Sequence, residues 1–357
     1  MKVGIVGASQ SGKTTLFRAL TRCKIAVQPI GSAKPNVGVV SVPDSRVDYF
    51  AEQYRPKKIT YAPIEFTDVA PRPAGQKEFD ASFFNDVRKS DAIVAVIRGF
   101  DNEYGEAPSP VSEIAAITDE LLLADLTLIE TRMERIEKSL HGAKKGAAGS
   151  PQQELEFMKK LQKCLEEGSR LKDLEYTEEE KKAMSGYDFL TLREVIAVLN
   201  VSEEELSEPG SVTGGFNSWC EENGVPHLAL CASAEMEISQ LSDEEEKEFL
   251  ADMGIAEPAR DALIKKTYDA LGLISFITAG EPEVRAWTVK KGATALEAAA
   301  AIHTDIAKGF IRAEIANFEE ILPAGSWENA KAQGIVKLYG KEHIIKDGDV
   351  LYIRCKA

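Results

Sequence analysis

The chain of 357 residues is 44% hydrophobic and 28% charged, values typical of globular protein, and it is long enough for two or three domains. Its formal net charge of −15 argues against attraction of nucleic acid over the whole surface, while leaving room for a local basic patch. Five scattered cysteines without CxxC or Cys/His spacing argue against a disulfide framework or a zinc site. No apolar run reaches membrane length and no signal peptide precedes the first predicted strand, so we expect a cytoplasmic protein that does not bind membranes.

Strand and helix patterns alternate through much of the chain. KVGIVG, residues 2–7, is a short β-branched run typical of a buried strand, and SQSGKTTLFRALTRC, residues 9–23, begins a helix with apolar residues at helical spacing. Further strands are predicted within residues 62–69, 91–100, 194–200 and 226–233. This alternation predicts an α/β fold, a parallel sheet covered by helices on both faces.

The stretch between residues 100 and 190 has a different pattern. Its apolar residues step by four and three, as in a coiled-coil seam: Leu122, Leu126, Ile129, Met133, Ile136 and Leu140. After the turn GAKKGAAGSP, a second helix carries Leu155, Met158, Leu161 and Leu165. We predict an antiparallel helical hairpin at residues 104–188, inserted into a sheet domain that comprises residues 1–103 and 189–274.

Residues 275–357 predict a compact α+β module. Short strands are expected within residues 283–289, 309–315, 334–340 and 349–355, around one helix, TALEAAAAIHTDIA. The module carries several cations in an otherwise acidic protein: Lys290, Lys291, Lys308, Arg312 and Lys337. A local patch of this kind fits RNA phosphates and equally fits an ordinary solvated surface.

The strongest functional signal is GASQSGKT, Gly7 to Thr14, which matches G-x-x-x-x-G-K-[ST] between a predicted strand and a predicted helix. In such a loop, successive backbone N–H groups wrap the phosphates of a nucleotide, and the next helix directs its positive end at them. Lys13 is predicted to reach the β- and γ-phosphates and serve catalysis, and the Thr14 hydroxyl to ligate Mg²⁺. The nucleotide contacts predicted in this loop are Gln10, Ser11, Gly12, Lys13, Thr14 and Thr15.

Asp68 ends the strand predicted at residues 62–69, where P-loop proteins place a carboxylate that supports Mg²⁺. A turn-forming Asp is the alternative. Many P-loop switch proteins have Gly three residues after this Asp, but here the residue is Pro71, which has no N–H to donate to a γ-phosphate. Arg72 is either a donor of positive charge to the transition state or a solvated side chain.

Polar residues also follow the strand predicted at residues 194–200, at the carboxyl edge where doubly wound sheets bind ligands. Guanine-specific proteins place N-K-x-D here, whereas this chain has Asn200 and Glu203, with Val201 in place of Lys. A polar strand exit is the alternative for both residues. The next strand ends in CAS, where the backbone N–H of Ala232 is predicted to meet the edge of the base of ATP or GTP.

These features together resemble the Obg-like ATPase family, in the YchF branch of the translation-factor-related P-loop proteins. The resemblance covers nearly the whole chain and includes KPNVGVVSVPD, FLTLREVIAVLNVSE and AEMEISQLSDEEEKEFLADMGI. The tail EVRAWTVKKGATALEAAAAIHTDIAKGFIRAEI resembles that family's TGS domain, a β-grasp module. The resemblance implies a P-loop NTPase sheet with an inserted coiled-coil arm, hydrolysis of ATP or GTP with Mg²⁺, and a ribosome or RNA partner contacted through the TGS domain and the arm.

Both switch segments depart from that family's pattern. The family's first-switch Thr, a Mg²⁺ ligand, corresponds to Ser32, which keeps a hydroxyl in a shorter loop. The second switch, D-x-A-G followed by a hydrophobic residue, reads DVAPRPAGQKEFD here, with Pro71 for Gly and Arg72 for the hydrophobic residue. We therefore interpret the protein as a slow nucleoside triphosphatase switch. The alternative is a nucleotide-loaded binding protein with negligible hydrolysis; the oligomeric state is not indicated by the sequence.

Overall fold

The computed structural model describes residues 1–28, 34–69, 81–102, 104–142 and 150–356. Internal contacts divide the chain into two units, one of residues 1–38 and 66–253, the other of residues 39–65 and 254–357. Two six-stranded sheets are present among the described residues. The predicted α/β fold class is confirmed.

The first sheet carries the P-loop. Its strands lie in the order β2 (Asn36–Ser41), β4 (Pro63–Asp68), β1 (Lys2–Val6), β5 (Ala92–Arg98), β6 (Glu194–Asn200) and β7 (His227–Leu230). The pairs β1–β5, β5–β6 and β6–β7 are parallel, with Ile5 opposite Val94 and Val94 opposite Ile196. β5 and β6 are apolar along almost their whole length because both faces of the sheet are buried.

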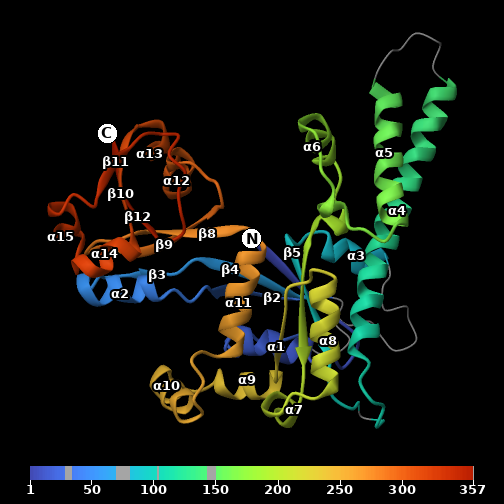
Figure 1. Ribbon diagram of the computed structural model, residues 1–357, viewed down its shortest axis with the longest axis horizontal. Coiled ribbons are helices and arrows are strands. Elements are labelled where there is room, and N and C mark those ends of the chain that lie inside the picture. The colour runs from blue at the N-terminus through green and yellow to red at the C-terminus, as the bar shows by residue number, and fades with distance from the viewer. Residues whose placement is uncertain (29–33, 70–80, 103, 143–149, 357) are drawn as a thin grey trace. The chain divides into compact units, whose positions relative to one another are not determined.

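Helices α1 (Lys13–Leu20), α3 (Ala81–Val87) and α8 (Ser211–Glu222) lie beside these strands (Figure 1). The first unit also contains α7 (Glu203–Ser207), α9 (Ala232–Ile238), which packs on α1, and α10 (Asp243–Asp252). One core cluster joins the central strands to α3, α8 and the first turns of the long helix α4, through residues such as Ile93, Val87, Phe216 and Ile114. The parallel sheet between helical layers is therefore the arrangement that the sequence predicts.

The inserted region is a helical hairpin. It contains α4 (Pro110–Gly142), α5 (Ser150–Glu166) and the short α6 (Glu178–Met184), with 3₁₀ turns at Leu171–Asp173 and Leu190–Leu192. α5 runs back beside α4 (Figure 1). The predicted seam is confirmed, because its α4 and α5 residues are buried or partly buried in one cluster: Leu122, Leu126, Ile129, Met133, Ile136, Leu140, Leu155, Met158, Leu161 and Leu165.

A buried carboxylate joins α4 to the sheet domain. Asp125 is 0% exposed, and its Oδ2 accepts hydrogen bonds from the backbone N–H and the hydroxyl of Thr191, each at 2.8 Å. Its Oδ1 accepts from the N–H of Leu190 at 3.0 Å and lies 3.4 Å from Nη1 of Arg88. Burial raises the pKa of Asp125, and the hydrogen bonds from Thr191 and Leu190 act in the opposite direction.

The second unit contains the mixed sheet. Its strands lie in the order β11 (Lys337–Tyr339), β10 (Phe310–Asn317), β12 (Asp349–Cys355), β8 (Leu273–Thr278), β9 (Val284–Lys290) and β3 (Ile59–Thr60). β10 is antiparallel to both β11 and β12, whereas β12–β8 and β3–β9 are parallel pairs. The predicted start of this module at residue 275 falls inside β8.

Six helices of the second unit are described: α2 (Ser45–Tyr54), α11 (Ala259–Ala270), α12 (Ala295–Ile302), α13 (Thr304–Lys308), α14 (Phe318–Ala324) and α15 (Trp327–Ala332). One helix was expected within residues 275–357, and this was wrong, because four of these helices, α12 to α15, lie there. His303 is extended, with φ −165° and ψ 141°, and its Nδ1 accepts from the N–H of Asp305 at 3.2 Å, so the predicted helix divides into α12 and α13. α14 and α15 were missed because each is only a few residues long, and α14 contains Pro323.

Residues 39–65 belong to the second unit although they precede most of the first. β3 extends the second sheet by pairing with β9, with Ile59 opposite Val284. On α2, the rings of Tyr49 and Phe50 pack edge-on against Phe318, with centroids 5.3 and 5.8 Å away. The sequence analysis did not predict that residues 39–65 belong to the second unit, because this depends on contacts with residues that are distant in the chain.

Replacing Asp125 with Ala should destabilise the protein, because two buried backbone N–H groups lose their acceptor. We expect the free energy of unfolding to fall by roughly 2–4 kcal/mol, measured by urea denaturation. Asp119→Ala, an exposed position on the same helix, is the control and should change it by less than about 0.5 kcal/mol. Equal effects of the two substitutions would show that Asp125 does not secure α4.

Candidate nucleotide-binding site

The P-loop is held in shape by two glycines between β1 and α1. Gly7 and Gly12 have φ of 149° and 93°, which side chains rarely allow, and Gln10 also has a positive φ of 63°. A Cβ on Gly7 would lie 2.2 Å from the carbonyl oxygen of Val96, and one on Gly12 would lie 2.2 Å from Nδ2 of Asn200. The loop therefore lies directly against β5 and β6.

Lys13 is the first residue of α1 and is almost completely buried, at 7% exposed. Its Nζ donates to the carbonyl oxygens of Gly7 and Ala8 at 2.7 and 2.6 Å, so the ammonium group lies over the loop. Gln10 is exposed, Ser11 is buried, and Thr15 is partly buried on α1. The loop residues predicted to surround the phosphates are thus brought together at the start of one helix.

Thr14 and Asp68, which are both predicted to serve a magnesium site, are hydrogen-bonded to each other. The hydroxyl of Thr14 donates to Oδ2 of Asp68 at 2.8 Å, and Nδ2 of Asn36 donates to the same oxygen at 2.9 Å. Asp68 is 1% exposed, and its Oδ1 is buried without a hydrogen-bond partner among the described residues. An unpaired carboxylate oxygen beside a hydroxyl is a donor set that suits Mg²⁺.

Burial disfavours the ionised form of the Asp68 carboxyl. Burial raises the pKa of this carboxyl, while hydrogen bonds from Asn36 and Thr14 and the charge of Lys13 lower it. A cation at Oδ1 would therefore relieve a desolvated carboxylate. Asn36 was not selected from the sequence, although it lies in the segment KPNVGVVSVPD that carries the family resemblance.

The side-chain amide of Asn200 links two loops. Its Nδ2 donates to the carbonyl oxygen of Ser11 at 2.9 Å, and its Oδ1 accepts from the N–H of Ala232 at 2.9 Å. Asn200 is 5% exposed, whereas Glu203 is exposed in the first turn of α7. The Ala232 N–H is thus already hydrogen-bonded to the Asn200 side chain. The predicted contacts of Asn200, Ala232 and Glu203 with a base stay predictions.

Two predicted site residues cannot be placed. Ser32, predicted to ligate Mg²⁺, and Arg72, predicted to assist catalysis, lie outside the described residues, as does Pro71. Among the helices that the structure describes, none is long and apolar enough to cross a membrane.

The parallel sheet, the P-loop at the end of β1 and the Thr14–Asp68 pair define a P-loop nucleotide-binding protein of the α/β class. Residues 273–356 match the model of the YchF-GTPase_C family, described as a "protein of unknown function (DUF933)". The chain is 37% identical to the ribosome-binding ATPase YchF of Bacillus subtilis strain 168, over 99% of both chains. It is 39% identical to the protein of the same name from Haemophilus influenzae, over 99% of this chain and 98% of the relative.

These full-length matches show that the chain belongs to the YchF family. The solved structure of the Schizosaccharomyces pombe YchF GTPase is similar throughout, with a TM-score of 0.86 and 28% sequence identity. That likeness covers 99% of this chain and 97% of the other. The family resemblance inferred from the sequence is confirmed.

Replacing Asn200 with Ala should weaken nucleotide binding, because the Ser11 carbonyl and the Ala232 N–H lose their buried partner. We expect a loss of about tenfold, or 1.4 kcal/mol, equal for ATP and GTP if the amide only positions the loops. Isothermal titration checks this, with Asn223→Ala, a largely exposed helix-end residue, as the control. Unchanged affinity for both nucleotides would contradict the positioning role, and loss for one alone would assign Asn200 to base recognition.

Proposed function

We propose that this protein is a Mg²⁺-dependent nucleoside triphosphatase with slow intrinsic turnover, acting as a nucleotide-controlled switch on a ribosomal partner. The observation that carries the proposal is the convergence of Lys13, Thr14 and Asp68 on the P-loop, with Thr14 and Asp68 joined at 2.8 Å. The names of the relatives, ribosome-binding ATPases, support ATP as a substrate and the ribosome as a partner.

The residues present fit Mg²⁺ and a nucleotide. Thr14 and Asp68 would hold the ion, together with Ser32 as predicted from the family resemblance. A bound Mg²⁺ offsets the charge that develops on the phosphate oxygens during transfer. Lys13, whose Nζ has two carbonyl acceptors, would exchange them for β- and γ-phosphate oxygens, a stronger charge-assisted interaction.

The second switch makes hydrolysis slow. With proline at position 71, that position cannot donate the backbone N–H that normally binds the γ-phosphate. A hydrogen bond to a charged group is worth about 1.5–3 kcal/mol, so the preference for triphosphate over diphosphate should fall by about one to two powers of ten. The residue directly after Pro71 is Arg72 rather than a Gln that could orient an attacking water, and the Gln of this segment is Gln76, five residues after Pro71. Arg72 is the candidate for stabilising the transition state.

The proline at position 71 also favours the second candidate function, a nucleotide-loaded binding protein with negligible hydrolysis. In that case the helical arm and the β-grasp module alone carry the function, and the nucleotide only stabilises the first unit. The two functions differ in one measurable quantity, the rate of the chemical step.

Single-turnover hydrolysis separates the two functions. We expect hydrolysis that is slow but clearly faster than in Lys13→Ala, because that lysine is the P-loop cation predicted to reach the γ-phosphate. Pro71→Gly should raise the preference for triphosphate over diphosphate by about ten- to a hundredfold. Turnover of several per second by the unmodified protein without a partner would contradict a weakened second switch, and a rate equal to that of Lys13→Ala would favour the binding protein.

The base specificity should be modest, with ATP bound at least as tightly as GTP. Guanine recognition by N-K-x-D uses a short carboxylate and a stacked Lys, whereas this chain has Glu203 and Val201. Glu203 is exposed at the start of α7, and its longer side chain would bring the carboxylate too close to guanine for the same geometry.

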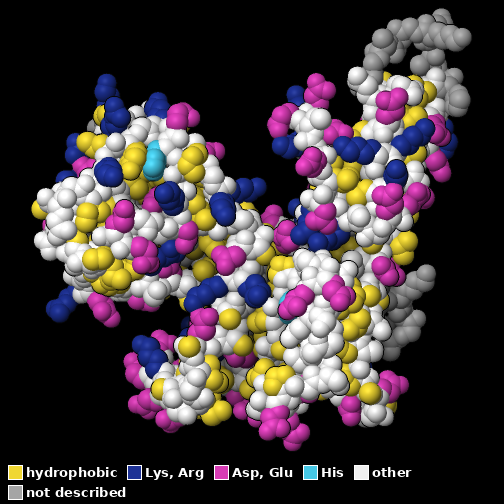
Figure 2. Space-filling model, in the orientation of Figure 1, with side chains coloured by type: hydrophobic (Ala, Val, Ile, Leu, Met, Phe, Trp, Pro, Cys, Tyr) yellow, Lys and Arg dark blue, Asp and Glu magenta, His cyan; other side chains and the backbone are white. Residues whose placement is uncertain are grey.

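The partner surface is proposed on the β-grasp module. Figure 2 shows Lys and Arg side chains over the unit that contains β10 and β12. Arg312 on β10 lies opposite Arg354 on β12 in the strand register. Arg354 was not among the cations selected from the sequence. Between Arg354 and Lys331, Glu314 is buried and accepts hydrogen bonds from both. Lys308 makes an ion pair with Asp305 and is a weaker candidate for phosphate contact.

Replacing Arg312 with Glu should weaken binding to ribosomes or RNA. Loss of one phosphate contact should reduce the affinity by about tenfold and the slope of log affinity against log salt concentration by about one. Co-sedimentation with ribosomes at several salt concentrations measures both quantities. Lys247→Glu, the same charge change on the exposed side of α10, is the control. Binding that falls equally in both variants, or in neither, would rule out a phosphate contact at Arg312.

A further inference from the structure

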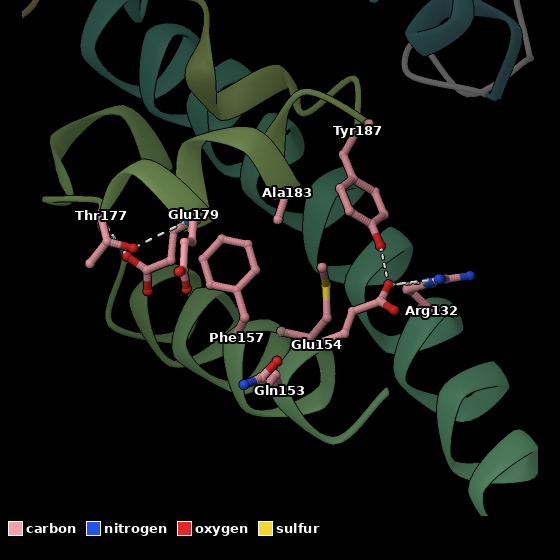
Figure 3. Close-up of a pocket in the computed structure, with 11 residues that line it drawn as sticks. Arg132, Gln153, Glu154, Phe157, Thr177, Glu179, Ala183 and Tyr187 are labelled. Atoms are coloured by element: carbon pink, nitrogen blue, oxygen red, sulfur yellow. Dashed lines mark hydrogen bonds and ion pairs between the residues drawn. The ribbon is translucent and has the colours of Figure 1, made fainter. Parts of the chain in front are cut away.

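A pocket of about 800 Å³ lies on the helical hairpin, away from the P-loop. It is bounded by α5, by α6 and by the chain that follows α6, with Arg132 of α4 at one end (Figure 3). We call it the arm pocket. A hollow of this size is in the range of pockets that hold a ligand or a few side chains.

One side of the arm pocket is apolar. Phe157 and Met158 of α5 line it and are 8% and 0% exposed, while Ala183 of α6 and the ring of Tyr187 complete the lining. The Tyr187 ring is itself fixed, because it stacks on Phe189 with centroids 5.3 Å apart. This surface suits the aliphatic stem of a long side chain.

The charged groups of the pocket are mostly carboxylates. Glu154, Glu179 and Glu180 line it, against the single cation Arg132. Arg132 makes an ion pair with Glu154, in which Nη2 of Arg132 lies 2.6 Å from Oε1 of Glu154. The hydroxyl of Tyr187 donates a hydrogen bond to the same oxygen at 2.6 Å. Figure 3 shows these three side chains gathered at one end of the pocket.

Hydrogen bonds favour the ionised form of two of the carboxylates, Glu154 and Glu180. Burial acts to raise the pKa of Glu154, but the hydrogen bonds from Tyr187 and Arg132 outweigh it and the pKa lies below its ordinary value. A hydrogen bond from Lys160 likewise lowers the pKa of Glu180. Glu179 is exposed on the rim and makes no ion pair with the residues that the structure describes.

We propose that the arm pocket binds the lysine or arginine side chain of an extended basic segment in a protein partner. The stem would lie along Phe157 and Ala183, and the charged head would reach Glu179 (Figure 3). Glu154 is paired with Arg132 and Glu180 with Lys160, so the remaining charge of the lining is the carboxylate of Glu179, which attracts a cation and repels a phosphate. The arm would thus recognise protein, whereas the β-grasp module is proposed to recognise nucleic acid. This goes beyond the proposed function and does not depend on nucleotide hydrolysis.

The test uses the full chain and a fluorescein-labelled peptide of alternating Gly and Arg, followed by fluorescence anisotropy at physiological salt. Glu179→Lys should weaken binding at least tenfold by reversing the charge at the rim. Ala183→Trp should weaken it as much by filling the pocket without changing charge. Glu156→Lys, the same charge reversal at an exposed residue of α5 outside the lining, should change affinity less than twofold.

Several results would overturn the proposal. Failure of the parent chain to bind the peptide would do so, as would equal losses in Glu179→Lys and Glu156→Lys, which indicate general electrostatic attraction. Unchanged binding by Ala183→Trp, with an unchanged thermal unfolding curve, would exclude the pocket as the site. Direct binding of a labelled ten-nucleotide uridine RNA that is lost in Ala183→Trp would assign the pocket to nucleic acid instead.

Discussion

The amide of Asn200 determines how the nucleotide site is assembled. It connects the P-loop to the start of α9 by hydrogen bonds to Ser11 and from Ala232, both 2.9 Å long, at the carboxyl edge of the sheet. Because the amide occupies the space that a Cβ on Gly12 would need, Asn200 in this position requires glycine at residue 12. Without this side chain, a buried carbonyl and a buried N–H in two different loops would both be unpaired, a cost that neither loop can relieve alone.

Two buried aspartates play comparable structural parts in the first unit. Asp68 accepts hydrogen bonds from residues of α1 and β2, and Asp125 accepts hydrogen bonds from the segment before β6. Arg88 directly follows α3, the helix that succeeds the second switch in the chain, and approaches Asp125 at 3.4 Å. The end of α3 and the helical arm are therefore joined through Arg88 and Asp125, so a displacement of α3 would act on α4 directly.

The sequence was informative wherever a local pattern decides the structure. The heptad steps of the hairpin, the apolar strands β5 and β6, and the P-loop all follow from spacing that neighbours in the chain enforce. The sequence did not show that Asn200 would turn its amide toward Ser11 or that Asn36 would reach Asp68, because those partners are distant in the chain. The same applies to α2 and β3, whose place in the second unit depends on contacts with Phe318 and β9.

The length of α4 has a mechanical consequence. The helix runs unbroken for 33 residues, which at 1.5 Å per residue is about 50 Å. Its first turns lie in the sheet core, its far half forms the hairpin, and Asp125 lies near its midpoint. Because Ile114, Ile117 and Leu121 also pack in the sheet core, α4 is held along its first half and projects beyond Asp125 like a beam fixed at one end. A small rotation of the fixed half is therefore enlarged at the tip of the arm.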